Sequence, residues 1–143
     1  MRKISYKGLR KKAWNLQSQF IRRKEAGYGD KLFGGCLRSD YCNNVLVGLV
    51  NCYTCGKTNH WKEMDVAHYI HKDCLDFEPD NLRVCCARCN RFLHGNLGVF
   101  AEKLIKEIGQ ERVDRLRELS HRVKKFTRQE LERIIEKYRG GEE

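Results

Sequence analysis

The sequence lacks any long apolar run. Within its 143 residues, no stretch approaches the roughly 18 apolar residues of a membrane-spanning helix, so we expect no membrane span. The basic N-terminus has no apolar segment behind it, and we therefore expect no secretion signal. Internal repeats and low-complexity tracts are also lacking. With 41% hydrophobic and 34% charged residues, the composition is that of a globular chain and not of a disordered one.

Acidic residues are missing from the first 24 positions, although the whole chain carries 19 of them. Lys and Arg total 29, which gives a net charge of +10. Nine basic residues lie in this N-terminal segment, and the remainder of the chain holds 20 basic against 19 acidic residues. This asymmetry indicates a polyanionic partner such as nucleic acid, with a solvated helix face as the alternative. The nine residues are Arg2, Lys3, Lys7, Arg10, Lys11, Lys12, Arg22, Arg23 and Lys24.

The basic segment 1–27 is predicted to be helical. The basic residues lie mostly off its apolar stripe, so the helix can pack by one side and present cations on the other. The apolar residues recur at spacings of three and four, as on one face of a helix over 8–26: they are Leu9, Ala13, Leu16 and Phe20.

The rest of the chain is predicted to be mixed α+β, and we expect one compact domain in all. Segment 28–50 is a loop that ends in a strand over 45–50, and segment 51–96 is the candidate functional core. The core contains two strands and a helix, expected at 63–71, 81–85 and 87–94. Segment 97–139 is predicted to be helical, and Thr127 and Glu130 match a capping box at the start of its last helix. The apolar stripes of this segment consist of Phe100, Leu104, Ile108, Val113, Leu116 and Val123.

Two Cys-x-x-Cys pairs are the strongest indication of a bound metal. Cys52 and Cys55 form the first pair, and Cys86 and Cys89 form the second. Each pair can place two thiolates in a tight turn, and together they supply the four soft ligands that tetrahedral zinc prefers. Such a site has no open coordination position, so we expect a structural zinc ion. Reduced core cysteines are the alternative.

Eight cysteines in a chain without a secretion signal indicate a reducing compartment and metal binding over disulfides. We therefore expect a cytoplasmic location. Cys85 precedes Cys86 directly and should point the other way in a strand, so we do not expect it to share the first zinc. The cysteines outside the two pairs have no metal-ligand spacing, and a second zinc, disulfides or free thiols stay open for them: Cys36, Cys42, Cys74 and Cys85.

Residues suited to phosphodiester hydrolysis lie between and after the cysteine pairs. That reaction needs a base for water and a cation to stabilise charge on the phosphate and the leaving oxygen. His68, on the expected strand, is suited to be the base, because an unperturbed histidine has a pKa of about 6.5. Asn90 and His94 are four residues apart, would share a face of the expected helix and could reach a divalent ion. A site with few, mostly neutral ligands suits Mg²⁺ or Mn²⁺.

Each of these residues also has a structural interpretation. A histidine on a strand can be part of the core, Asn81 can cap or turn the chain, and Asn90 can begin a helix without any metal. Their grouping between and beside two cysteine pairs, with Asp65 just ahead of His68, favours the functional interpretation.

This order of Cys-x-x-Cys, a strand His, a following Asn and Cys-x-x-Cys-Asn is similar to the zinc-stabilised HNH, or His-Me finger, endonucleases. More closely, the chain resembles the phage NinG (Rap) recombination endonucleases, over most of its length except 27–50. The resemblance implies a ββα-metal core with a four-cysteine zinc site, flanked by the basic helix and C-terminal helices. The resembling segments are CYTCGKTNHWKEMDVAHYI, NLRVCCARCNRFLHGNL, LIKEIGQERV and FTRQELERIIEKY, with AWNLQSQFIRR upstream.

The resemblance implies a role for each matched position. His68 would be the general base, Asn81 would orient it and tie the hairpin together, and Asn90 would ligate the Mg²⁺ or Mn²⁺ ion. Many HNH proteins have an acidic ligand immediately before the base, where this chain has Ala67. Asp65 instead resembles the Asp-x-x-His form of non-specific nucleases, and would act through water or a neighbouring ligand.

The same resemblance implies an endonuclease that cuts branched DNA, such as D-loops and Holliday junctions, during recombination. A homodimer would suit a symmetric junction, host or viral recombination proteins would be partners, and the interior of the host cell would be the location. Two alternatives are a non-catalytic zinc module that binds nucleic acid and a site-specific HNH homing or restriction nuclease. Beyond the N-terminal cations, the DNA backbone would be held by Arg91, Arg122, Lys124, Lys125 and Arg128.

Overall fold

The computed structural model describes residues 4–27 and 48–140. Their contacts divide the chain into two compact units. The terminal unit combines 1–48 with 126–143, and the central unit comprises 49–125. We expected one compact domain from the sequence. The division arises because the helices near the two ends of the chain pack on each other.

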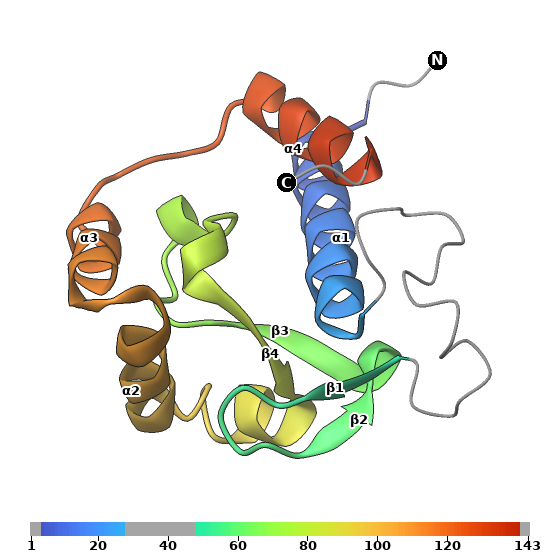
Figure 1. Ribbon diagram of the computed structural model, residues 1–143. Coiled ribbons are helices and arrows are strands. Elements are labelled where there is room, and N and C mark those ends of the chain that lie inside the picture. The colour runs from blue at the N-terminus through green and yellow to red at the C-terminus, as the bar shows by residue number, and fades with distance from the viewer. Residues whose placement is uncertain (1–3, 28–47, 141–143) are drawn as a thin grey trace. The chain divides into compact units, whose positions relative to one another are not determined.

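The terminal unit consists of α1 (Tyr6–Glu25) and α4 (Arg128–Gly140), which lie side by side (Figure 1). The bounds of α1 match the predicted helix within two residues at each end. The helix begins after Ser5, whose hydroxyl accepts the backbone N–H of Gly8 at 3.1 Å. This bond satisfies one of the amides that the first helical turn leaves without a partner.

The buried face of α1 departs from the predicted stripe over positions 16 to 18, where Ser18 is also buried. Leu16 is half-buried, whereas Gln17 is completely buried and donates its amide N–H to the Tyr138 hydroxyl at 3.0 Å. The ring of Phe20 packs on Tyr138 with a centroid distance of 5.2 Å. Position 17 follows Ala13 by four residues, so the stripe of the helix passes through a polar side chain that apolar periodicity does not identify.

The predicted capping box ahead of α4 is confirmed. The backbone N–H of Thr127 donates to the Glu130 carboxylate at 2.7 Å, and the N–H of Glu130 donates to the Thr127 hydroxyl at 3.2 Å. Leu131, Ile135 and Tyr138 are buried in the helix that follows.

The central unit contains two antiparallel hairpins in its described residues. β1 (Leu49–Asn51) pairs with β2 (Thr58–His60), and β3 (Met64–His68) pairs with β4 (Leu82–Cys86). β1 is the end of the strand expected at 45–50, of which positions 45–47 lie outside the described residues. β2 was not predicted, because three residues are too short to show an alternating pattern.

β3 ends at His68, three residues earlier than expected. The backbone N–H of Tyr69 still donates to the Asn81 carbonyl at 2.8 Å. The N–H and the carbonyl of Ile70, however, bind the side-chain amide of Asn81 at 2.8 and 2.9 Å. An asparagine side chain here replaces the strand partner, and the chain leaves the hairpin.

The helix expected over 87–94 is a single π-helical turn, Arg88–Phe92. The backbone then becomes left-handed, with φ of 49° at His94 and 50° at Asn96. These dihedrals cannot continue a right-handed helix. The expectation that Asn90 and His94 share a helix face is therefore wrong.

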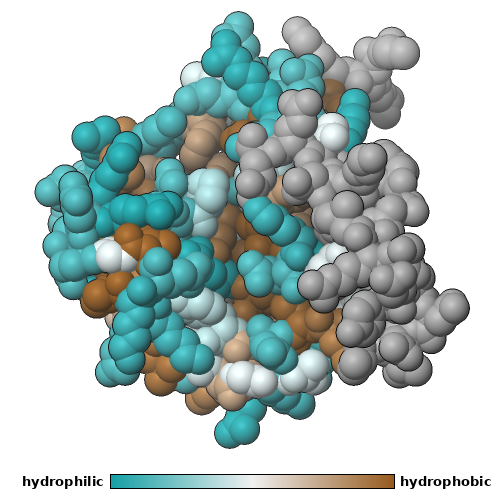
Figure 2. Space-filling view, viewed as in Figure 1, coloured by the Kyte–Doolittle hydropathy of each residue, from teal (hydrophilic) through white to brown (hydrophobic). Residues whose placement is uncertain are grey.

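Two helices complete the central unit, α2 (Leu97–Ile108) and α3 (Gln110–Ser120). Phe100 of α2 is fully buried, and its ring lies 5.0 Å from the ring of Tyr53 and 5.7 Å from that of Tyr69. Hydrophilic side chains dominate the face of α2 and α3 seen in Figure 2, with small apolar patches between them. None of the described helices is both long and apolar enough to cross a membrane.

The apolar stripes of these helices were predicted in part. Leu104, Val113 and Leu116 are buried, whereas Val123 is 100% exposed. The cause is that α3 ends at Ser120, so position 123 no longer lies on a helix face.

Ion pairs join both helices to the β3–β4 hairpin. The Arg83 guanidinium on β4 pairs with Glu107 of α2 at 3.0 Å, and Arg112 of α3 pairs with Asp80, just before β4. The helices therefore cover the hairpin through charge as well as through apolar packing.

We expect Tyr138→Phe to lower the free energy of unfolding by about 1–3 kcal/mol, because it leaves the buried Gln17 amide without this acceptor. Urea denaturation measures the change. Tyr6→Phe is the matched control: its hydroxyl donates to the Phe126 carbonyl at 2.7 Å, but the residue is 40% exposed and water can replace the bond, at a cost of about 0.5 kcal/mol. Equal losses in the two variants would contradict the buried role of Gln17.

Candidate metal centre and histidine site

The four paired cysteines come together in the central unit. The sulfur atoms of Cys52, Cys55, Cys86 and Cys89 all lie within 4.8 Å of one another, and those of Cys55 and Cys86 are 3.8 Å apart. Zinc–sulfur bonds of about 2.3 Å in a tetrahedron place neighbouring sulfurs about 3.8 Å apart. The geometry fits the expected ion, and the group could bind a structural metal such as zinc.

Two turns position these sulfurs. The first links β1 to β2: the Cys52 N–H donates to the Lys57 carbonyl at 2.8 Å, and the Gly56 N–H donates to the Cys52 carbonyl at 2.9 Å. Gly56 has a φ of 75°, which favours glycine. The second turn runs from the end of β4 into the π-helical turn. A bond from the Tyr53 N–H to the Val84 carbonyl, at 2.8 Å, ties the first turn to β4.

The electrostatics of the group favour a cation. Burial raises the pKa of Cys52, but hydrogen bonds from backbone N–H groups and the Thr54 hydroxyl outweigh it and lower the pKa to about 5. Burial raises the pKa of Cys89 to about 12. One thiolate is therefore already favoured at neutral pH, and a bound divalent ion would supply the charge that ionises the others.

The remaining cysteines lie outside this group. Cys85 is fully buried, and burial raises the pKa of its thiol to about 12. Cys74 is half-buried and donates its S–H to the Leu119 carbonyl at 3.4 Å. Neither forms a disulfide within the described part of the chain. Cys36 and Cys42 lie outside the described residues.

His68 occupies the last position of β3, and its side chain is 17% exposed. Its Nε2 lies 3.2 Å from the backbone carbonyl oxygen of Asp76. A carbonyl can only accept, so this bond places the ring proton on Nε2 and makes Nδ1 the basic nitrogen. Burial lowers the pKa of His68, although the Asp76 carbonyl and carboxylate oppose that shift. The ring is therefore neutral at pH 7 and can accept a proton.

Asp76 was not predicted as a partner of His68. It lies in a polar loop eight residues after the histidine, and no spacing rule connects the two. A backbone carbonyl carries no residue-type signal, so only the folded loop reveals the contact.

Asn81 is completely buried beneath this loop. In addition to its bonds to Ile70, its amide nitrogen donates to the Leu75 carbonyl at 3.3 Å. Leu75 directly precedes Asp76, so Asn81 fixes the backbone that orients His68. It acts on that backbone and makes no hydrogen bond to the imidazole within the described residues.

Asp65 of β3 and Asn90 of the π-helical turn are joined by a hydrogen bond. The Asn90 amide nitrogen donates to the Asp65 carboxylate at 3.1 Å, so the Asn90 amide oxygen is the atom that can coordinate a cation. Arg91 donates two bonds of 2.8 Å to the same carboxylate. Arg91, which we expected to contact a DNA phosphate, is thus paired with Asp65, although 64% of its side chain is exposed.

His94 lies beyond the π-helical turn, with an exposed side chain. The helical spacing that suggested a metal shared with Asn90 is not formed, because the turn ends at Phe92 and the backbone of His94 is left-handed.

The basic residues of α1 lie mostly off its buried face. Each of those in the described part is exposed or half-exposed, as are Lys124 and Lys125 after α3. Arg2 and Lys3 lie outside the described residues. The described cations of α1 are Lys7, Arg10, Lys11, Lys12, Arg22, Arg23 and Lys24.

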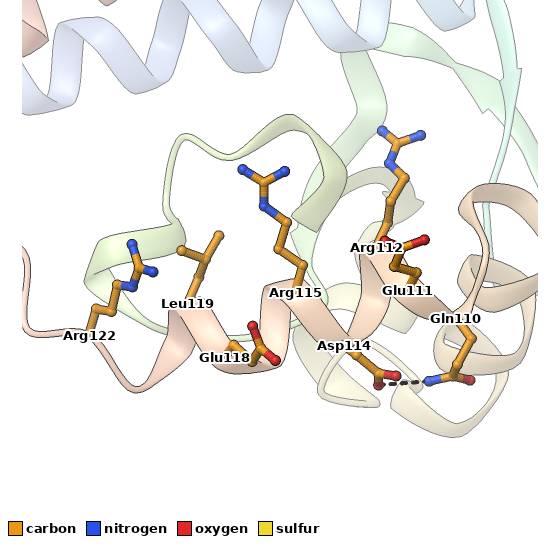
Figure 3. A pocket seen from close by; sticks show the side chains of 8 residues that line it. All are labelled: Gln110, Glu111, Arg112, Asp114, Arg115, Glu118, Leu119 and Arg122. Atoms are coloured by element: carbon orange, nitrogen blue, oxygen red, sulfur yellow. Dashed lines mark hydrogen bonds between the residues drawn. The ribbon is translucent and has the colours of Figure 1, made fainter.

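A hollow of about 850 Å³ runs along α3. Figure 3 shows Arg112, Arg115 and Arg122 extending to the same side of α3 and the turn after it. Three carboxylates balance these three arginines, so the hollow has no excess charge for an anion. It is lined by Gln110, Glu111, Arg112, Asp114, Arg115, Glu118, Leu119 and Arg122.

We expect the purified protein to contain one zinc ion per chain, and Cys86→Ser to lose it. Loss of the ion should lower the free energy of unfolding by on the order of 5 kcal/mol, because a structural zinc site couples binding to folding. Metal analysis and thermal unfolding measure both effects. Cys74→Ser is the control, since its thiol lies outside the four-sulfur group; equal zinc loss in that variant would refute the assignment.

Comparison with known proteins identifies the family. The family model for Bacteriophage Lambda NinG protein matches residues 10–142. Two curated relatives, Protein ninG of Escherichia phage 933W and Protein ninG of Enterobacteria phage VT2-Sa, are each 33% identical over 90 residues. The alignment covers 61% of this chain and 44% of each relative, so the chain spans less than half their length. No solved structure matches. Since the family model covers nearly the whole chain, this mixed α+β protein with its four-cysteine group belongs to the NinG family.

Proposed function

We propose that this protein is a metal-dependent endonuclease of the His-Me finger type that cuts branched DNA during phage recombination. The observation that carries the proposal is the bond between Nε2 of His68 and the Asp76 carbonyl. It leaves Nδ1 as the proton acceptor of a neutral imidazole, which is the state a general base requires.

The surrounding framework supports the same interpretation. An antiparallel hairpin, β3–β4, leads into a short helical turn that carries Asn90, and the four-cysteine group lies where hairpin and turn meet. His68 and Asn90 thus come from the two elements that a ββα site would use. Membership of the HNH superfamily is part of this proposal.

In the proposed reaction, Nδ1 of His68 takes a proton from water, and the water oxygen attacks the phosphorus. The bond from phosphorus to the 3′-oxygen breaks, the leaving oxygen takes a proton from solvent, and a 5′-phosphate and a 3′-hydroxyl remain. The Asp76 carboxylate, 4.0 Å from Nε2, stabilises the imidazolium that forms. Asn90 would hold Mg²⁺ or Mn²⁺ through its amide oxygen, and the ion would offset negative charge on the phosphate and the leaving oxygen.

The DNA backbone would be held by the cations of α1 and by Lys124 and Lys125, since phosphate contacts supply affinity without reading sequence. A homodimer on a symmetric junction and recombination proteins as partners belong to the same proposal.

A non-catalytic nucleic-acid-binding module is the second candidate. It is favoured by the engagement of Asp65 with Arg91 and by Ala67 at the position where many HNH proteins have an acidic ligand. Few groups then remain to hold a catalytic ion. Cleavage that depends on Mg²⁺ or Mn²⁺ would exclude this candidate, and cleavage at one sequence in linear duplex would favour a site-specific nuclease.

We expect His68→Ala to reduce cleavage of an immobile four-way junction by about 10²–10⁴-fold, because it removes the general base. The assay compares the junction with a linear duplex of matched sequence in Mg²⁺ or Mn²⁺, and binding should be retained. The control is His121→Ala, because His121 is an exposed histidine after α3. This variant should cleave as the wild type does. Full cleavage by His68→Ala would exclude this residue as the base.

We also expect the cleavage rate to rise with pH along a limb whose midpoint lies below 6.5, since burial lowers the pKa of His68 from that value. Below the midpoint the imidazole is protonated and cannot accept a proton from water. The same shift makes the folded state lose stability as pH falls through 6.5, because the unfolded chain binds the proton more readily. Single-turnover cleavage rates measured across this pH range test the direction of the His68 pKa shift. A midpoint above pH 6.5 would contradict a lowered pKa.

A further inference from the structure

Three apolar side chains are exposed around the turn that follows Asn90. Phe92 is 76% exposed, Leu93 45% and Leu97 43%. Single exposed apolar residues are common on protein surfaces, but a contiguous group indicates a binding surface. We call Phe92, Leu93 and Leu97 the apolar knob.

The backbone of the apolar knob is held in place. The Gly95 N–H donates to the carbonyl of Cys89 at 2.8 Å, and the Asn96 N–H donates to the carbonyl of Leu93 at 2.8 Å. Since Cys89 belongs to the four-sulfur group, the bond from Gly95 attaches the turn directly to that group. The knob is therefore presented on a fixed support and not on a loose loop.

The same turn lies beside the histidine site. A Cβ atom built on Gly95 would stand 3.9 Å from the backbone carbonyl of His68. The turn that carries Phe92 and Leu93 thus abuts the end of β3, where the proposed base is located. The apolar knob and the proposed base thus belong to neighbouring segments of the central unit.

The charge around the knob indicates what it binds. The segment 81–101 contains three arginines and no carboxylate. Arg83 and Arg91 are paired with Glu107 and Asp65, and Arg88 is exposed. Since two of these arginines are neutralised by carboxylates, Arg88 supplies the positive charge next to the exposed apolar side chains. An exposed cation beside apolar side chains matches a partner that has both negative charge and flat apolar faces, as nucleic acid has in its phosphates and bases.

We propose that Phe92 and Leu93 stack on an unpaired or terminal base at a DNA branch and thereby make the adjoining site selective for branched substrates. This inference rests on the proposed nuclease function. In continuous duplex each base is covered on both sides, so an apolar side chain must first separate two bases. At a branch or a strand end one base face is already open, and stacking requires no such separation.

The test measures binding in a His68→Ala background, so that DNA is not cut. The probes are an immobile four-way junction with 2-aminopurine at the branch point and a linear duplex of matched sequence. Phe92→Ala should weaken junction binding by about 5- to 150-fold, the range for loss of one base–aromatic stack, and should leave duplex binding within about twofold. Phe92→Trp should retain junction binding and the change in 2-aminopurine fluorescence.

Val123→Ala is the matched control, since Val123 is fully exposed and lies after α3. It should bind both probes as the parent does. Unchanged junction binding by Phe92→Ala, or equal weakening on both probes, would overturn the proposal. So would self-association of the parent that Phe92→Ala abolishes without changing junction binding, because a second copy would then cover the knob. Cleavage by the wild-type chain is assayed separately, so a failed nuclease assignment is distinguishable from a failed stacking assignment.

Discussion

The convergence of four cysteine sulfurs is the constraint on which the central unit depends. Its strands are only three and five residues long, and such short hairpins are marginal without further support. The sulfurs join the β1–β2 turn to the end of β4. The carbonyl of Cys89 accepts a hydrogen bond from the Gly95 N–H, which attaches the turn that carries the apolar knob to the same group. A metal bound by this group would therefore support both the histidine site and its neighbouring surface.

A second set of contacts determines the orientation and the tautomer of His68. Asn81 is buried and binds the backbone on either side of the loop after β3. That loop presents the Asp76 carbonyl to His68, which sets the tautomer, while burial keeps the ring neutral. The asparagine thus reaches the imidazole only through backbone, and its importance for the proposed chemistry lies in positioning. Asn90 is positioned in a similar way, by the carboxylate of Asp65.

The division into two units separates the concentrated positive charge from the candidate chemistry. α1 carries the N-terminal cations and packs on α4 through a face that includes the buried Gln17–Tyr138 bond. The central unit carries the cysteine group and His68, with ion pairs that hold α2 and α3 to its hairpin. In the proposed function, contacts to the DNA backbone and contacts to bases would accordingly come from different parts of the chain, as is general for proteins that bind DNA.

Features that depend on neighbours in sequence could be predicted without the fold. The helix of the basic segment, the capping box at Thr127 and the two Cys-x-x-Cys turns are of this kind, because capping and ligand pairing act over a few residues. The early end of β3, the burial of Gln17 and the contact of His68 with Asp76 are not. Each of these features depends on a contact between two separate elements or on a contact to a backbone atom. Such contacts leave no pattern of residue types in the sequence. The sequence thus indicated which side chains could bind a metal or accept a proton. Tertiary packing decided how these side chains are oriented, because their orientation depends on partners distant in sequence that only folding brings near.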